Sequence, residues 1–144
     1  MSYLIGSSLA LLTVILLKLA RLNRYKVFYP LLLVVIASYY VLFALLGKDW
    51  HALFIEIGVM LLFSIVAIVA YFKNPLWIVL GLLAHGLFDY LHPYLWSNSG
   101  LPNWWPQFCM SYDVVLAGAI LLSKKREQEK YNQNDPQGFM RNID

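Results

Sequence analysis

The residues most able to do chemistry lie in an apolar stretch from Leu76 to Trp96, which contains His85, Asp89 and His92. Ionisable side chains at bilayer depth cost roughly 2.5–3.5 kcal/mol each on insertion scales, so a group of them indicates a functional site. At about 100° per residue, positions i, i+4 and i+7 fall on one face of a helix. We therefore expect these three side chains to point to one place.

Two further carboxylates, Glu56 and Asp113, occupy other apolar segments. No neighbour of Glu56 in the sequence can neutralise it, so its partner must come from another helix. Asp113 lies too deep in its segment to serve only the dipole of the helix N-terminus. We predict that Glu56, His85, Asp89 and Asp113 converge on one pocket and are the catalytic residues.

A metal ion is one chemistry that this set allows, because imidazole and carboxylate ligands suit zinc, iron or manganese. The candidate ligands are His85, Asp89, His92, Glu56 and Asp113. His85 and His92 are about 10 Å apart along an ideal helix. A single divalent ion is therefore expected to take Asp89 with one of the histidines, and with Glu56 or Asp113.

Three other functions stay open for these residues. A carboxylic acid in an apolar pocket can protonate an alkene or epoxide without a metal, and a His–Asp pair can return the proton. Buried Asp, Glu and His also occur along proton or cation paths of transporters. A non-catalytic binding or sensing role is the third. We favour an enzyme that acts on a lipid-like or isoprenoid substrate, as a hydrolase, isomerase or cyclase.

The composition is that of a membrane protein. Of 144 residues, 60% are hydrophobic and 13% are charged, and the mean hydropathy is +0.61, outside the range of soluble domains. The net charge of +3 comes from basic residues at segment ends and in the tail, so a nucleic-acid partner is not expected. Cys109 is the one cysteine, which rules out an intrachain disulfide.

Five apolar segments are each close to the 20 residues that a membrane-spanning helix needs. They cover residues 3–20, 27–46, 51–72, 76–96 and 108–123. The predicted fold is an all-α bundle of five transmembrane helices, formed by residues 1–123 as one domain. Residues 124–144 are polar and are expected to form a cytoplasmic tail without regular structure.

Basic residues set the predicted orientation. They gather in the first loop, the third loop and the tail: Lys18, Arg21, Arg24, Lys26, Lys73, Lys124, Lys125 and Arg126. In a five-span bundle these segments share one side, which the positive-inside rule makes cytoplasmic. The N-terminus is then outside, the strongly polar residues fall in the outer half of the membrane, and the plasma membrane is the expected location. The expected partners are membrane lipids and a lipid-like small molecule.

Proline and aromatic residues give three local expectations. Pro93 follows His92 and disfavours helical dihedrals there, so the helix is expected to kink or stop. Tyr39 and Tyr40, with Ser38, lie in the middle of their segment and could donate hydrogen bonds to the pocket, but packing is the favoured explanation. Trp104 and Trp105, with prolines on both sides, are typical of an interfacial anchor or of a lid over the site.

The order of these residues resembles a family of small integral membrane proteins of uncharacterised function. The resemblance covers the second half of the chain: a His85-x3-Asp89-x2-His92 helix, then a Cys109-x3-Asp113 pair in the next helix. Glu56 corresponds to an acidic residue early in the preceding span. Members carry a second histidine where this chain has Pro93, which weakens any scheme with four histidine ligands. The resemblance implies a shared buried site and no particular activity.

Overall fold

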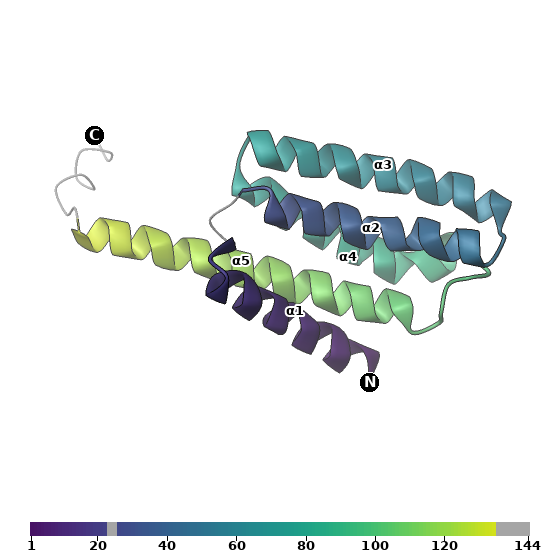
Figure 1. Cartoon of the computed structure of the whole chain (residues 1–144), viewed down its shortest axis with the longest axis horizontal. Coiled ribbons are helices and arrows are strands. Elements are labelled where there is room, and N and C mark those ends of the chain that lie inside the picture. Colours follow the sequence, from purple (N-terminus) through teal and green to yellow (C-terminus); the bar gives the residue numbers. More distant parts are fainter. Residues whose placement is uncertain (23–25, 135–144) are drawn as a thin grey trace.

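The computed structural model of the chain describes residues 1–22 and 26–134, and this part of the chain is all-helical. The described residues form five helices, and Figure 1 shows how they are arranged. Their bounds are α1 Ser2–Leu19, α2 Phe28–Leu46, α3 Trp50–Phe72, α4 Pro75–Leu95 and α5 Trp105–Asn134. Each contains a stretch long and apolar enough to cross a membrane, which confirms the predicted bundle of five spans.

The helices alternate in direction along the bundle. α2 packs against α3 and α4 packs against α5, while α1 lies along α5, and α4 also contacts α2 and α3 (Figure 1). We call the end where α2 and α4 end and α3 and α5 begin the site end. The opposite end, from which α5 extends toward the C-terminus, is the tail end.

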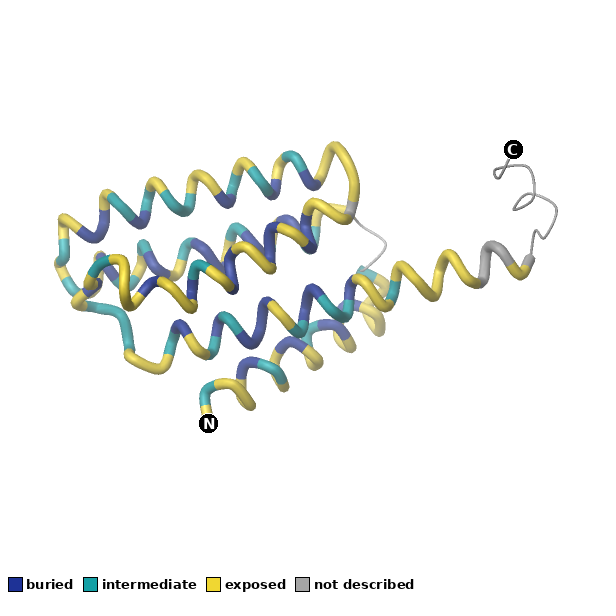
Figure 2. The backbone as a smooth tube through the Cα atoms, turned by 180° about the vertical axis from the view of Figure 1, so that it is seen from behind, coloured by how far each residue is buried: buried dark blue, intermediate teal, exposed yellow. Residues whose placement is uncertain are grey.

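Burial follows the pattern of a membrane bundle. In Figure 2, dark-blue buried positions recur along the helices and alternate with yellow exposed positions. Many exposed residues are large and apolar, including Leu61, Ile65 and Phe72, as expected where helices face lipid rather than water. The core of the tail-end half is purely apolar, for example at Leu33 and Ala67.

Two sequence expectations are wrong at helix ends. α5 continues through Asn134, whereas no regular structure was expected after Ser123. Its polar turns contain strong helix formers and a Lys124–Glu127 ion pair at 3.0 Å, which both favour helix. Arg24 and the tail residues 135–144 lie outside the described residues.

The second difference concerns Pro93, which does not stop α4. The helix runs on to Leu95 with Pro93 inside it. Only three helical residues follow His92, so proline removes one hydrogen bond, the one to the carbonyl of Asp89, from the last turn. His92 stays on the inner face of the helix and is 1% exposed.

Gly6 lets α1 approach α5 closely. A Cβ atom at this position would meet the hydroxyl of Ser111 and the backbone carbonyl of Phe108. Small residues at such crossings allow the close backbone contact that drives helix association in membranes. The Gly6 contact therefore fixes α1 on the rest of the bundle.

We expect Gly6→Ala to destabilise the protein by about 1–3 kcal/mol, because the added methyl group forces the helices apart. Gly58→Ala is the matched control, since a Cβ atom there meets nothing within 4 Å and alanine favours helix. Thermal unfolding in a mild detergent measures both variants. Equal midpoints for the two variants would contradict the proposed contact.

Candidate functional site

The structure places all five predicted site residues in the interior. Glu56, His85, Asp89 and Asp113 are 0% exposed and His92 is 1% exposed. They lie toward the site end of the bundle, on α3, α4 and α5. α4 provides three of them, because i, i+4 and i+7 spacing keeps them on the helix face that packs inward.

His85 joins α4 to α5. Its Nδ1 atom lies 2.7 Å from Oδ2 of Asp113 and 3.4 Å from Oδ2 of Asp89. When Asp113 is ionised, Nδ1 of His85 is the donor of this hydrogen bond, because an ionised carboxylate only accepts. The other ring nitrogen, Nε2, is buried without a partner in the described part of the chain.

Tyr40 completes this group from α2. Its hydroxyl donates a hydrogen bond of 2.7 Å to Oδ1 of Asp89, and the side chain is 1% exposed. Of the two roles left open for Tyr40, the structure therefore supports donation to the site over packing alone. We call His85, Asp89, Asp113 and Tyr40 the His85 cluster.

A second polar group forms around Glu56, one turn closer to the site end. Oε1 of Glu56 accepts hydrogen bonds from Nε2 of His92 at 2.7 Å, Nε1 of Trp96 at 3.0 Å and Nδ2 of Asn98 at 3.2 Å. When Glu56 is ionised and His92 is neutral, Nε2 is the donor and Nδ1 keeps a lone pair. Nδ1 is buried without a partner in the residues described. We call Glu56, His92, Trp96 and Asn98 the Glu56 cluster.

Aromatic rings connect the two clusters. The Tyr40 ring centroid lies 4.7 Å from that of His92 and 6.2 Å from that of His85. Phe88 contacts both histidines, at 5.8 Å from His85 and 5.4 Å from His92. The predicted residues thus form one continuous interior region with two polar parts, rather than one set of ligands around a point.

The loop between α4 and α5 closes the site end. Asn98 is buried there, and its amide also donates to the backbone carbonyl of Tyr40 at 3.2 Å. Gly100 is required at the tip, since a Cβ atom would meet the carbonyl of Phe43. Sequence reasoning missed Asn98, because its partner Glu56 lies 42 residues away.

Asp49 ties the same loop to the start of α3. Its carboxylate accepts hydrogen bonds from the backbone N–H of Ala52 at 3.1 Å and of Ser99 at 3.2 Å. These two bonds hold the pKa of Asp49 below its usual range, because they stabilise the charged form. Asn98 therefore anchors the loop on its buried side, and Asp49 anchors it on its exposed side.

The His85 cluster has the composition of a cation site. One nitrogen of His85 and one oxygen from each of Asp89 and Asp113 lie within 4.8 Å of one another. Oδ2 of Asp89 and Oδ1 of Asp113 have no hydrogen bond from the described residues. His92 and Glu56 are outside this set, so of the combinations left open above, the geometry groups Asp89 with His85 and Asp113.

A polar opening leads to Asp89 from the site end. The cavity measures about 140 Å³ and lies between α1, α4 and α5, where Asp89 adjoins Tyr3, Pro93, Asn103 and Gln107. Polar groups line this cavity, so it is suited to water and small ions. The region around Asp89 is therefore next to a polar route although its side chain is buried.

Replacing Tyr40 tests how much Asp89 depends on its donor. We expect Tyr40→Phe to destabilise the protein by about 1–3 kcal/mol, because a buried carboxylate oxygen loses its hydrogen bond. Tyr39→Phe is the control, since Tyr39 is 38% exposed. Denaturant unfolding followed by tryptophan fluorescence measures the difference. Equal loss in both variants would show that Asp89 does not depend on Tyr40.

Comparison of the chain with protein-family models, with curated proteins and with solved structures finds no match. The interpretation of the site therefore depends on the residues and distances given above. Those distances define a buried His–Asp–Asp group, a neighbouring His–Glu pair and a polar opening at one end of a five-helix membrane bundle.

Proposed function

We propose that this protein is a membrane-embedded, metal-dependent enzyme that hydrolyses a lipid-like substrate at the His85 cluster. The observation that carries the proposal is the convergence of His85, Asp89 and Asp113, which are fully buried and keep unpartnered polar atoms. One imidazole and two carboxylates suit zinc, manganese or iron. Three protein ligands also leave a position for water, as in catalytic zinc sites.

Charge balance supports a cation. Three carboxylates are buried, and none of the described lysines or arginines is buried with them. Isolated buried carboxylates are costly, so they need protons or a positive charge nearby. A divalent ion would take the place of the proton shared by His85 and Asp113 and would offset the charge of both aspartates.

The residues around the ion have separate tasks in this proposal. A bound divalent ion lowers the pKa of water enough to supply hydroxide at neutral pH. Tyr40 orients Asp89 by its hydrogen bond of 2.7 Å. Glu56 fixes the tautomer of His92, whose free Nδ1 serves as the acid–base group. For an ester, Nδ1 of His92 would take one proton from water, the remaining hydroxide would bond to the acyl carbon as the acyl C–O bond breaks, and Nδ1 would return the proton to the departing alkoxide.

Metal-free acid–base catalysis on an isoprenoid is the second candidate. The observation that favours it is that each carboxylate has a donor of its own at 2.7 Å: Tyr40 for Asp89, His85 for Asp113 and His92 for Glu56. Such pairs can move protons during an isomerisation or cyclisation. Transport is less well supported, because the core of the tail-end half is apolar.

The proposed orientation has the N-terminus outside and the tail in the cytoplasm of a plasma membrane. This orientation puts the basic loops on the cytoplasmic side, as the positive-inside rule expects. The residues concerned are Lys18, Arg21, Lys73 and Lys124. Reporter fusions after Gly47 and after Lys124 test it. We expect opposite sidedness at the two points, and the same sidedness at both would overturn the orientation.

Metal content tests the proposed function most directly. We expect about one zinc, manganese or iron ion per chain in protein purified with a histidine-free tag, and roughly tenfold less in Asp89→Asn and Asp113→Asn. Each change keeps the shape of the side chain and removes its charge. Elemental analysis by mass spectrometry measures the content.

His51→Ala is the matched control for these variants, because His51 is exposed at the start of α3. It should keep the metal content of the unaltered chain. Folded protein without metal would overturn the metal-dependent mechanism and favour the acid–base one. Metal that stays in both aspartate variants and is lost in His51→Ala would place the ion elsewhere.

A further inference from the structure

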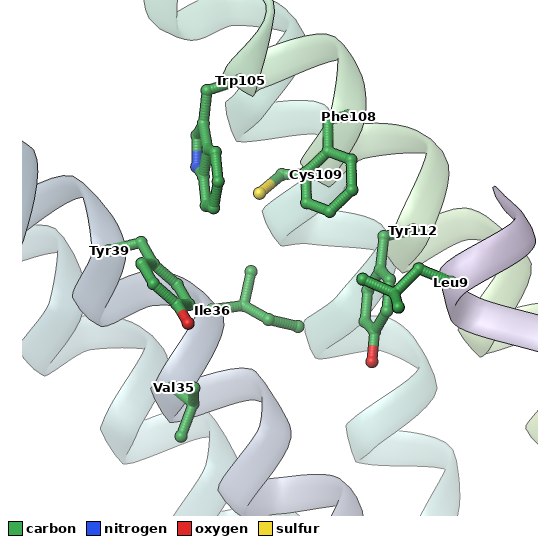
Figure 3. A pocket seen from close by; sticks show the side chains of 8 residues that line it. All are labelled: Leu9, Val35, Ile36, Tyr39, Trp105, Phe108, Cys109 and Tyr112. Carbon is green, nitrogen blue, oxygen red and sulfur yellow. The ribbon is translucent and has the colours of Figure 1, made fainter. Parts of the chain in front are cut away.

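An apolar groove lies between α2 and α5 on the flank of the bundle. Its volume is about 240 Å³, and its walls include Val35 and Tyr39 of α2, Cys109 and Tyr112 of α5 and Leu9 of α1. Figure 3 shows these side chains facing a common space between the helices. α2 packs on α3, and α5 packs on α1 and α4, so the groove lies between these two groups of helices.

Both walls of the groove carry a residue that lies one helical turn from a member of the His85 cluster. Ile36 lines the groove and lies one helical turn before Tyr40, which binds Asp89. Cys109 lines the opposite wall and lies one turn before Asp113. Residues at i and i+4 share a helix face, so the buried floor of the groove and the reactive groups belong to the same inner surface.

The site end of the groove is closed by aromatic rings. The Trp105 ring centroid lies 5.0 Å from Tyr39 and 4.8 Å from Phe43, which joins α5 to α2. Nε1 of Trp105 is buried without a hydrogen-bond partner in the described chain. An indole N–H donates only, so a lining residue of the groove holds one donor that no described residue uses.

The lining sets the chemistry of an occupant. None of the residues that line the groove is charged, so a phosphate or other ionic group gains nothing there. Empty apolar volume is unfavourable beside a close-packed core. A groove on the side of a membrane bundle faces the hydrocarbon core of the bilayer, which contains no water, so a hydrocarbon chain is the group that can fill it.

We propose that this groove holds the hydrocarbon chain of the substrate, and that Trp105 Nε1–H binds an uncharged oxygen of the same molecule. The ligand class is a single-chain lipid alcohol or its ester. It enters sideways from the bilayer, whereas water and the cation reach Asp89 through the polar opening on the other side of α5. This inference rests on the proposed function, because the occupant is a substrate only if the adjacent His85 cluster is the catalytic site.

Photolabelling tests the groove. The probe is a long-chain fatty alcohol with a diazirine in its chain, added to the full-length protein in nanodiscs. We expect labelled peptides from 35–39 and 105–112, competition by unlabelled fatty alcohol, and little competition by the corresponding alkyl phosphate. Val35→Trp should fill the mouth of the groove and reduce labelling of these peptides about tenfold, the change that a loss of 1.4 kcal/mol in binding produces.

Leu42→Trp is the matched control, because Leu42 lies on the same helix and is 44% exposed against 41% for Val35. It should keep the labelling. Leu9→Trp, on α1, provides a second groove-filling variant with its own folding check by size-exclusion chromatography. Even labelling along all lipid-facing helices, or equal labelling in Val35→Trp and Leu42→Trp, would overturn the groove as a binding site.

Asp89→Asn separates this inference from the proposed function. Labelling that survives in Asp89→Asn while no form of the protein contains metal would support the groove and reject the metal-dependent mechanism. Stoichiometric metal without selective labelling would reject the groove alone. Equal competition by the alkyl phosphate would overturn the assignment of an uncharged ligand.

Discussion

The three buried carboxylates each need a donor from another helix, and α4 takes part in all three pairs. His85 binds Asp113 of α5, Asp89 binds Tyr40 of α2, and His92 binds Glu56 of α3. A helix pair in a membrane gains little from the hydrophobic effect, so directed polar contacts have a large share in fixing its arrangement. A rotation of α4 about its axis would therefore disturb all three pairs at once.

The Glu56 cluster links this arrangement to the loop at the site end. One carboxylate oxygen of Glu56 takes donors from α4 and from the loop, through His92, Trp96 and Asn98. Loss of its charge would therefore loosen three segments at once rather than one contact. The loop is part of the interior polar network, and its exposed side is held separately by Asp49 and Gly47.

Much of the fold could be predicted because the length of an apolar run is set by membrane thickness. The inward set His85, Asp89 and His92 could be predicted because spacing of four and three residues fixes a helix face. Tyr40 could not, since a tyrosine among apolar residues packs equally well with or without a polar partner. Asn98 depends on contacts more than 40 residues away, and the polar turns after Ser123 have a composition that suits both helix and disorder.

Because α5 is one continuous helix, the position of its basic residues fixes the depth of Asp113 in the bilayer. Lys124 follows Asp113 by 124 − 113 = 11 residues on the same helix, which is about 16 Å at 1.5 Å per residue. Lysine and arginine side chains favour the headgroup boundary, and the hydrocarbon core is about 30 Å thick. With Lys124, Lys125 and Arg126 at that boundary, Asp113 is held close to the bilayer midplane. Inserting or deleting one residue between them would shift this depth by about 1.5 Å and turn the carboxylate by about 100° away from His85.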